Sequence, residues 1–265
     1  MDLAPFRVEL DQAEISGVRR AGTGTPLVLL HGFGGSWQDW RQVIAALPSG
    51  RPLVAYDQRG FGNSRAEPGT PFSHAEDLLA VLDALGIDCA HLCGMSLGGA
   101  SVLNMALDAP DRVARLVLVS PLIVGWSWSA EWVERWKQIG RAARGGDMAH
   151  ARELWWRHPL FDSVRESAGG QALHDAVMAF PGRQWVQDDQ RPALPDVDRL
   201  SSLALPTLLL TGARDTEDFR LIADAIAALA TNVTRIDHAH AGHMLNLENP
   251  ESIAAEIGQF LEAEG

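Results

Sequence analysis

Short runs of apolar residues recur along the chain, and each run is bounded by Gly, Pro or Asp. Runs of this kind that are rich in Val, Ile and Leu are typical of β-strands. The pattern predicts about eight strands, at Phe6–Leu10, Ile15–Arg19, Leu27–Leu30, Leu53–Tyr56, His91–Cys93, Leu116–Val119, Thr207–Leu210 and Thr234–Ile236. A short polar segment joins the first two strands, so we expect an antiparallel hairpin at one edge of a sheet.

From Leu27 onward the strands alternate with segments in which apolar residues follow the spacing of an amphipathic helix. These segments are Trp37–Leu47, Ser73–Leu85, Leu97–Ala109, Phe219–Ala230 and Ser252–Glu262. Alternation of strands and helices produces a mostly parallel sheet with helices on its faces. The pattern therefore predicts an α/β fold.

The alternation stops between Leu122 and Leu200, where no strand-like run occurs. Glycine and proline pairs at 145–146, 169–170 and 181–182 divide this stretch into several helical pieces. We predict a helical insertion over residues 122–200, called the cap segment below, between two parts of one core at 1–121 and 201–265. A single core of this size is ordinary for a chain of 265 residues.

The cap segment is rich in tryptophan and arginine. Seven of the nine tryptophans lie in it, namely Trp126, Trp128, Trp132, Trp136, Trp155, Trp156 and Trp185. Buried aromatic rings serve packing in most proteins, and several of them also line apolar binding pockets, so both roles stay open. The tryptophans favour an apolar or aromatic substrate group. An arginine that faces inward is able to bind a substrate carboxylate. The cap segment has seven arginines, namely Arg135, Arg141, Arg144, Arg152, Arg157, Arg165 and Arg183.

Composition narrows the classes of protein to which the chain belongs. Apolar residues make up 46% and charged residues 21%, and no stretch approaches the roughly 18 consecutive apolar residues of a membrane helix. The first ten residues lack the basic start and long apolar run of a signal peptide, so we expect a cytoplasmic protein. The net charge of −12, with no cluster of Lys and Arg, opposes binding to nucleic acid or to anionic membranes.

Two further expectations follow from composition. Cys89 and Cys93 lie on one predicted strand, where their spacing is too long for a disulfide, so we expect both to be reduced. The sequence has no Cys or His spacing typical of a metal site, no P-loop and no G-x-G-x-x-G that opens a strand–helix unit. We therefore expect no metal and no organic cofactor, and whether the chain forms a homo-oligomer stays open.

The clearest chemical motif is G-x-S-x-G in Gly94-Met95-Ser96-Leu97-Gly98, which follows the strand His91–Cys93 and opens the next helix. A serine on a tight strand-to-helix turn projects its hydroxyl above the edge of the sheet. The glycines are needed where side chains would collide with neighbouring backbone. The N-terminus of the helix favours developing negative charge. Ser96 is therefore the predicted nucleophile.

With this motif in place, the chain resembles the α/β-hydrolase family along nearly its whole length. His31-Gly32-Phe33-Gly34 is similar to the oxyanion loop of that family, and Asp57-Gln58-Arg59-Gly60-Phe61-Gly62-Asn63-Ser64 is similar to its D-x-R-G-x-G-x-S segment. The resemblance implies the α/β-hydrolase fold, with a mostly parallel eight-stranded sheet flanked by helices and a helical cap insertion. It also implies that the backbone N–H groups of Phe33 and Leu97 form the oxyanion hole, that Arg59 is structural and that His31 supports the loop.

A nucleophilic serine needs a histidine to take its proton and a carboxylate to orient that histidine. The order in the family is Ser, acid, His. His243 is the predicted base because Ala241-Gly242-His243 and Glu248-Asn249-Pro250 resemble the family's G-H-x-x-x-x-E-x-P pattern, while His238 and His240 fit less well. The predicted acid is Asp215 in Gly212-Ala213-Arg214-Asp215, which resembles G-x-x-D. Glu217 and Asp218 lie in the same loop and compete with it.

The reaction that these motifs imply is hydrolysis of a carboxylic ester or lactone, a small-molecule substrate, through an acyl-enzyme. The chain looks most like small bacterial carboxylesterases and 3-oxoadipate enol-lactonase-like hydrolases. Cofactor-free haloperoxidases share the pattern. Carbon–carbon bond hydrolases of dienone acids typically carry G-N-S-M-G and a Trp after the histidine, where this chain has Met95 and Met244. Dehalogenases and epoxide hydrolases carry aspartate in place of Ser96, and a small-molecule receptor on the same fold is the non-enzymatic alternative.

Overall fold

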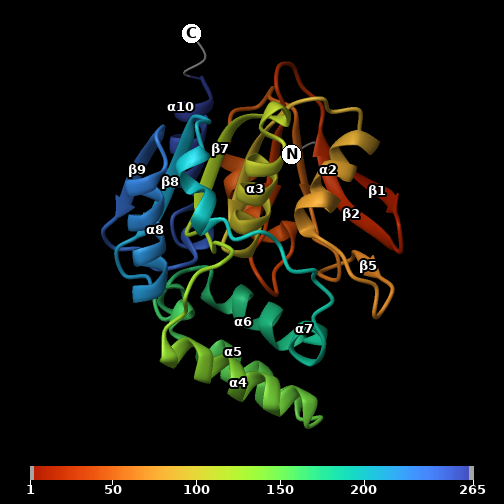
Figure 1. The fold of residues 1–265 in the computed structure, drawn as a ribbon, viewed down its shortest axis with the longest axis vertical. Coiled ribbons are helices and arrows are strands. Elements are labelled where there is room, and N and C mark those ends of the chain that lie inside the picture. Colours follow the sequence, from red (N-terminus) through yellow and green to blue (C-terminus); the bar gives the residue numbers. More distant parts are fainter. Residues whose placement is uncertain (1–2, 263–265) are drawn as a thin grey trace.

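The computed structural model describes residues 3–262, and within this range nine strands form a single sheet (Figure 1). The strands are β1 (Ala4–Leu10), β2 (Ala13–Arg20), β3 (Leu27–Leu30), β4 (Leu53–Tyr56), β5 (Arg65–Ala66), β6 (Ala90–Met95), β7 (Val113–Val119), β8 (Thr207–Gly212) and β9 (Val233–His238). The main order is β1-β2-β4-β3-β6-β7-β8-β9, and β5 pairs with β2. The eight predicted strands are confirmed, whereas the two-residue β5 was not predicted because it is too short to form a pattern.

Pairing within the sheet follows the prediction. β1 and β2 form an antiparallel hairpin, and β2 also runs antiparallel to β4. Every further pair from β4 to β9 is parallel. Parallel strands place their carboxyl ends at one edge of the sheet, so the loops that follow β3, β6 and β8 meet there.

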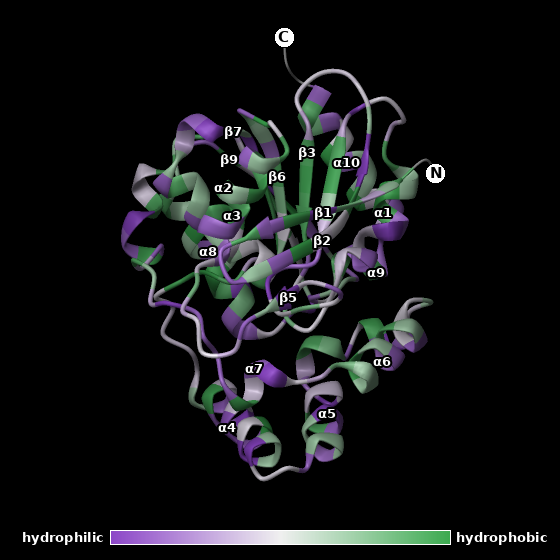
Figure 2. Ribbon diagram, turned by 90° about the vertical axis from the view of Figure 1, so that its right-hand side faces the viewer, coloured by the Kyte–Doolittle hydropathy of each residue, from purple (hydrophilic) through white to green (hydrophobic). Residues whose placement is uncertain are grey.

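Burial explains why the central strands of the sheet consist of continuous apolar runs. Every residue of β3, β4, β6 and β8 is buried, since these strands lie inside the sheet and helices cover both faces. Figure 2 shows the hydrophobic colour concentrated in these central strands, whereas β1 and β2 alternate. The sheet therefore forms a rigid support for the loops at its carboxyl edge.

The core helices are α1 (Arg41–Ala46), α2 (His74–Ala84), α3 (Leu97–Asp108), α8 (Glu217–Leu229), α9 (Leu245–Glu248) and α10 (Pro250–Glu262). The expected helix Trp37–Leu47 differs, because it begins as the 3₁₀ turn η1 (Trp37–Trp40) before α1 starts. A capping box explains the start of η1. The Ser36 side chain accepts from the Gln38 N–H, and the Asp39 carboxylate accepts from the Ser36 N–H.

The cap segment contains α4 (Ala130–Arg144), α5 (Met148–Trp156), η3 (Pro159–Phe161), η4 (Val164–Glu166), α6 (Gly170–Ala179) and α7 (Arg183–Val186), and η5 (Val197–Ser202) crosses its end. Helices α4 to α7 gather at one end of the sheet (Figures 1 and 2). The predicted breaks coincide with boundaries, since Gly145 ends α4 and Gly182 precedes α7. The division of the chain at residues 122 and 200 stays a prediction.

A buried carboxylate ties the end of the cap segment to the core. Asp196 Oδ1 accepts from Asn104 Nδ2 on α3 at 2.9 Å and from Arg199 Nη2 at 2.9 Å. Its Oδ2 accepts from the Val124 N–H at 3.4 Å, near the beginning of the cap segment. One side chain thus holds both ends of the cap segment against α3.

Two sequence expectations concern membranes and thiols. Among residues 3–262, none of the helices combines the length and apolar character that crossing a bilayer requires. Cys89 and Cys93 are both free thiols, as expected.

Candidate active site

Ser96 occupies a strained turn between β6 and α3. Its backbone angles are φ 51° and ψ −113°, in a region that residues with a Cβ rarely adopt. The surrounding backbone holds this conformation, because the Ser96 N–H donates to Val119 O at 3.0 Å and Ser96 O accepts from the Leu122 N–H at 3.0 Å. The strained turn fixes Ser96 at the carboxyl edge of the sheet.

The two glycines of the motif are needed for close packing. A Cβ on Gly94 would lie 2.1 Å from Gly98 O, and a Cβ on Gly98 would lie 2.4 Å from Leu30 O in β3. Both separations are far inside van der Waals contact with backbone atoms, which have little freedom to move. Glycine therefore lets α3 begin directly against β3 and β6.

His243 and Asp215 form a buried hydrogen-bonded pair. His243 Nδ1 lies 2.8 Å from Asp215 Oδ2, and both side chains are buried. The other carboxylate oxygen, Asp215 Oδ1, accepts from the Thr216 N–H at 2.7 Å. The Phe219 ring packs edge-on against the imidazole, with ring centroids 4.2 Å apart. A proton on Nδ1 donates to Asp215 and leaves Nε2 as the basic nitrogen.

The competing carboxylates and histidines lie elsewhere. Asp218 accepts hydrogen bonds from the Ser129 N–H, from Ser129 Oγ and from Trp126 Nε1, so it anchors the start of the cap segment. His238 Nε2 lies 3.0 Å from Glu256 Oε2, and His240 is exposed. The structure thus brings Asp215 to His243 and gives Asp218 a different set of partners.

The predicted oxyanion residues lie beside the serine. Phe33 and Leu97 line the same cavity as Ser96 and His243. Within residues 3–262 the backbone N–H groups of Phe33 and Leu97 have no hydrogen-bond acceptor, which leaves both free for a ligand. Two free donors beside the serine hydroxyl fit the requirements of an oxyanion hole.

His31 supports this loop, as expected. Its Nδ1 lies 2.7 Å from Gly32 O, and its Nε2 accepts from the Gln58 N–H at 2.9 Å. Burial lowers the pKa of His31, against an opposing contribution from Asp57, and keeps the ring neutral. A neutral ring is required here, because one nitrogen donates while the other accepts.

Arg59 is structural, as predicted. Its Nε and Nη2 donate to the two oxygens of Asp77 at 2.8 and 2.7 Å, and its Nη1 donates to Asp11 O at 3.1 Å. Arg59 does not line the cavity that contains Ser96. This buried bidentate ion pair fixes the loop after β4 against α2.

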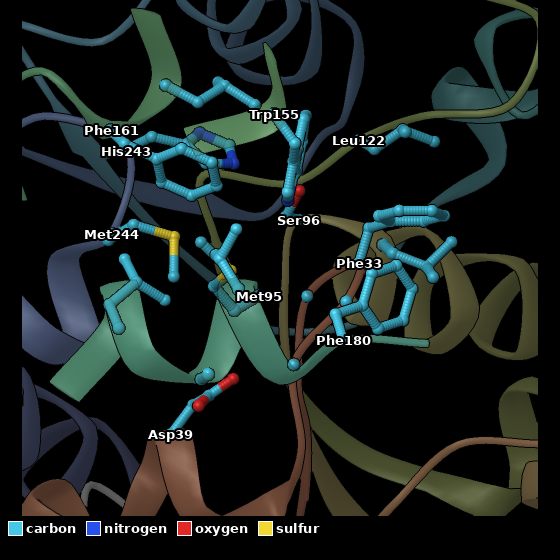
Figure 3. Close-up of a pocket in the computed structure, with 18 of the residues that line it drawn as sticks. Phe33, Asp39, Met95, Ser96, Leu122, Trp155, Phe161, Phe180, His243 and Met244 are labelled. Carbon is cyan, nitrogen blue, oxygen red and sulfur yellow. The ribbon is translucent and has the colours of Figure 1, made fainter. Parts of the chain in front are cut away.

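The cavity around Ser96 is apolar (Figure 3). Aromatic residues of the cap segment that line it are Trp132, Trp136, Trp155, Phe161 and Phe180. Aliphatic groups come from Leu122, Leu160, Leu173, Ala176 and Val177, and sulfur from Met95 and Met244. Three of the seven cap tryptophans thus line the cavity, and the other four belong to the hydrophobic core or pack against it. None of the seven cap arginines lines it, so this cavity lacks the arginine that would bind a substrate carboxylate.

An aromatic cluster joins the oxyanion loop to the cap segment. The Phe33 ring makes edge-to-face contacts with Trp136, Trp155 and Phe180, with centroid distances of 5.1, 5.8 and 5.7 Å. Edge-to-face pairs of this kind contribute about 0.5–1.5 kcal/mol beyond the burial of their area. Packing of the cap helices therefore helps to hold the Phe33 backbone in place.

Glu248 organises the loop that carries His243. Its Oε2 accepts from the Gly242 N–H at 2.8 Å, and its Oε1 accepts from the Met244 N–H at 3.2 Å. Ser163 Oγ, from the cap segment, donates to Oε2 at 2.5 Å. The sequence indicated Glu248 only as part of a motif. Its spacing after His243 in that motif was the signal that it holds the His243 loop.

Asp39 is a second residue whose place in the site the sequence did not reveal. It lines the cavity and is partly buried. Desolvation raises its pKa to about 7; the hydrogen bond from the Ser36 N–H lowers the pKa, and the charge of Asp57 raises it. Within residues 3–262 no group of three or more His, Cys, Asp or Glu side chains is arranged to hold a metal ion.

The chain is similar to known hydrolases in sequence and in fold. The putative carbamate hydrolase RutD of Caulobacter vibrioides is 31% identical to this chain over 253 residues, which cover 90% of this chain and 91% of the relative. The 3-oxoadipate enol-lactonase 1 of Acinetobacter baylyi is 27% identical over 84% of each chain. The crystal structure of carboxylesterase CesB (YbfK) from Bacillus subtilis superposes with a TM-score of 0.83 at 26% identity, covering 100% of this chain and 93% of that one.

The family itself is defined by a match over most of the sequence. The model of the α/β-hydrolase fold family matches residues 25–250, which include the serine turn, the oxyanion loop and the His243 loop. The fold, the order of the strands and the relatives agree with that match. The chain belongs to the α/β-hydrolase fold family and is a hydrolase with esterase-like and lactonase-like relatives.

Proposed function

We propose that the protein hydrolyses a carboxylic ester or lactone with Ser96 as nucleophile, His243 as general base and Asp215 as the acid that orients the base. The observation that carries the proposal is the 2.8 Å contact between His243 Nδ1 and Asp215 Oδ2, next to a cavity that Ser96 and His243 both line. This contact leaves His243 Nε2 as the nitrogen that accepts a proton.

In the first half of the reaction, Ser96 Oγ attacks the carbonyl carbon while His243 takes the hydroxyl proton. The tetrahedral intermediate collapses, the bond to the alcohol oxygen breaks, and His243 returns the proton to that oxygen. In the second half, water loses a proton to His243 and attacks the acyl group on Ser96. Collapse releases the acid and restores the serine hydroxyl. A lactone follows the same steps, with acid and alcohol in one product.

The negative charge of each intermediate needs stabilisation. We assign this role to the backbone N–H groups of Phe33 and Leu97, whose lack of other acceptors within residues 3–262 supports it. A donor of this type contributes about 3–4 kcal/mol to transition-state stabilisation in comparable enzymes. The aromatic contacts of Phe33 keep its N–H oriented before substrate arrives.

Three features favour esters and lactones among the reactions of this family. The relatives include a carboxylesterase and an enol-lactonase by name, together with a putative carbamate hydrolase and a 2-hydroxymuconate semialdehyde hydrolase. Met244, rather than Trp, follows His243, which weakens the carbon–carbon hydrolase alternative. The apolar cavity favours an uncharged carbonyl flanked by hydrophobic groups. We further propose that residues 122–200 act as the cap that forms this cavity.

Steady-state hydrolysis of p-nitrophenyl acetate, butyrate and hexanoate tests the proposal, together with a small panel of lactones and dienone acids. The wild type is expected to hydrolyse the esters, and Ser96→Ala is expected to reduce kcat by at least about a thousandfold. Turnover of the esters by Ser96→Ala at the wild-type rate contradicts the mechanism. Cleavage of the dienone acids but not of the esters favours the carbon–carbon hydrolase, and tight binding without turnover favours a receptor.

A further inference from the structure

Asp39 is an unusual residue for the cavity in which it lies. Among the cavity-lining residues that the structure describes, His243 and Asp39 are the ionisable ones, and the remainder of the wall is mainly aromatic, aliphatic or glycine. His243 has its partner in Asp215. Asp39 has no cation beside it, since neither Lys nor Arg lines the cavity. A carboxyl group in such a place carries a desolvation cost that an amide would not.

The geometry leaves part of the carboxyl group free. Asp39 Oδ2 accepts from the Ser36 N–H at 3.2 Å as part of the capping box. Asp39 Oδ1 has no hydrogen-bond partner within the described part of the chain. Figure 3 shows the carboxyl group turned toward the cavity, at the end of the lining away from Ser96 and His243. An acceptor oxygen is therefore presented to whatever fills that end.

Local structure alone does not require this charge. The capping box needs one acceptor for the Ser36 N–H, and an asparagine supplies that acceptor without an ionised group. Burial raises the pKa of Asp39 to about 7, and the nearby carboxylate of Asp57, which accepts from the Trp37 N–H at 2.8 Å, raises it as well. The ionised form of Asp39 is thus less favoured than that of a solvated carboxylate, and a cation beside it stabilises this form.

We propose that Asp39 determines specificity by binding a protonated amine at the end of the substrate remote from the scissile carbonyl. The inference rests on the proposed function, because it places the reacting carbonyl at Ser96. A protonated amine supplies an N–H donor for the free oxygen and the positive charge that the cavity lacks. The aromatic wall also tolerates an alkylammonium group, since the faces of Trp and Phe rings attract cations. The substrate class is an aminoalkyl ester or an amine-bearing lactone.

Isosteric pairs of esters test this inference. For the acyl side, we compare ethyl 5-(dimethylamino)pentanoate with ethyl 6-methylheptanoate, in which a carbon replaces the nitrogen. For the alcohol side, we compare 2-(dimethylamino)ethyl butyrate with 3-methylbutyl butyrate. Acid release is followed at about pH 7.5, where the amines are largely protonated and Asp39 is more than half ionised. The readout is the ratio of kcat/KM for the amine ester to kcat/KM for its neutral partner.

The decisive variant is Asp39→Asn, which keeps an acceptor for the Ser36 N–H and removes the charge. We expect the ratio to fall by about 10- to 100-fold in at least one pair, the range of a desolvated charge-assisted hydrogen bond. Ser36→Ala is the matched control, because it removes the other half of the capping box and leaves the carboxyl group. It is expected to change both esters of a pair by the same factor. An unchanged ratio in Asp39→Asn for both pairs overturns the inference.

A binding measurement separates this inference from the proposed reaction. Calorimetry on Ser96→Ala compares 5-(dimethylamino)pentan-1-ol with its carbon isostere 6-methylheptan-1-ol, and no turnover is needed. We expect the amine to bind at least about tenfold more tightly, and this preference to disappear when Asp39→Asn is added. If the wild type hydrolyses no ester, the proposed function fails, and the amine preference still supports the role of Asp39. Equal binding with and without Asp39→Asn overturns that role.

Discussion

Ser163 Oγ donates a 2.5 Å hydrogen bond to Glu248 Oε2, and the same carboxylate binds the backbone N–H groups on both sides of His243. A residue of the cap segment thus contacts the group that positions the predicted base. Glu248 does not line the cavity, so it acts on His243 through the backbone and is a positioning residue. The placement of the cap and the orientation of the imidazole are therefore linked by one side chain.

Glu248→Gln is expected to lower kcat about tenfold with little change in KM. The amide retains one acceptor oxygen and loses the other, so either Gly242 or Met244 loses a charge-assisted partner for its N–H. Ser163→Ala, which removes one donor, is expected to have a smaller effect of about threefold. Kinetics with a p-nitrophenyl ester measure both. Glu251→Gln, at an exposed position of α10, is the control, and equal kcat values for Glu248→Gln and this control contradict the role.

The assignment of the acid is tested by comparing Asp215, in the turn after β8, with Asp218, in the first turn of α8. Asp215→Asn is expected to lower kcat by about 10³- to 10⁴-fold, because the imidazole loses the acceptor that fixes its tautomer. Asp218→Asn is expected to lower kcat less than about tenfold, because Asp218 binds Ser129 and Trp126 rather than His243. The kcat values of the two variants on one p-nitrophenyl ester distinguish the two assignments of the acid. The reverse order of effects assigns the acid to Asp218.

The buried histidine His74 is expected to make stability depend on pH. Its ring packs against Phe61 and Phe72, and neither ring nitrogen has a partner within the described chain. Burial lowers the pKa of His74 from 6.5 to about 3, with further contributions from His31 and Arg59. Only the unfolded state then binds a proton between these two pH values, so the folded state loses stability as the pH falls below 6.5.

His74→Leu removes this dependence without removing a hydrogen bond. Between about pH 7.5 and about pH 5.5, the wild type is expected to lose about 1.4 kcal/mol more of its free energy of unfolding than the variant. Urea denaturation of both proteins at the two pH values gives this difference. Parallel pH profiles for the two proteins show that His74 takes up a proton in the folded state.

Close packing at the serine turn is tested with two helical glycines. Gly98→Ala is expected to cost at least about 3 kcal/mol of stability, because its Cβ meets Leu30 O at 2.4 Å. Gly258→Ala is the control in α10, where the nearest atom to a Cβ is Pro48 Cδ at 3.5 Å, an ordinary contact. This control is expected to be neutral or to stabilise by up to about 1 kcal/mol. Similar urea midpoints for the two variants contradict the packing account.

The sequence predicted the parts of the fold that follow a repeating pattern. The strands from Leu27 onward were found because burial on both faces makes them continuously apolar. The helix expected at Trp37–Leu47 was wrong in its first turn, since apolar spacing does not distinguish a 3₁₀ turn from the start of an α-helix. β5 has two residues and leaves no pattern at all.

The site was predictable to the extent that motifs mark strand ends. The resemblance of the segments around Asp215 and His243 to motifs of the family implied that the two side chains meet, and they are hydrogen-bonded. Asp39 was missed because it falls within an amphipathic segment, where a charged residue is usually solvated. The suggestion that a cap arginine binds a substrate carboxylate in this cavity was wrong, since none of the seven lines it. Composition does not reveal which face of a helix is turned inward.

The central claim is that Ser96 carries the acyl group during turnover. Rapid mixing with excess p-nitrophenyl butyrate, acid quenching within the first turnover and intact-protein mass measurement test it directly. We expect the mass to increase by one butyryl group, peptide mapping to place that group on Ser96, and Ser96→Ala to show no increase. A butyryl group on another residue, or the same increase in Ser96→Ala, contradicts the account.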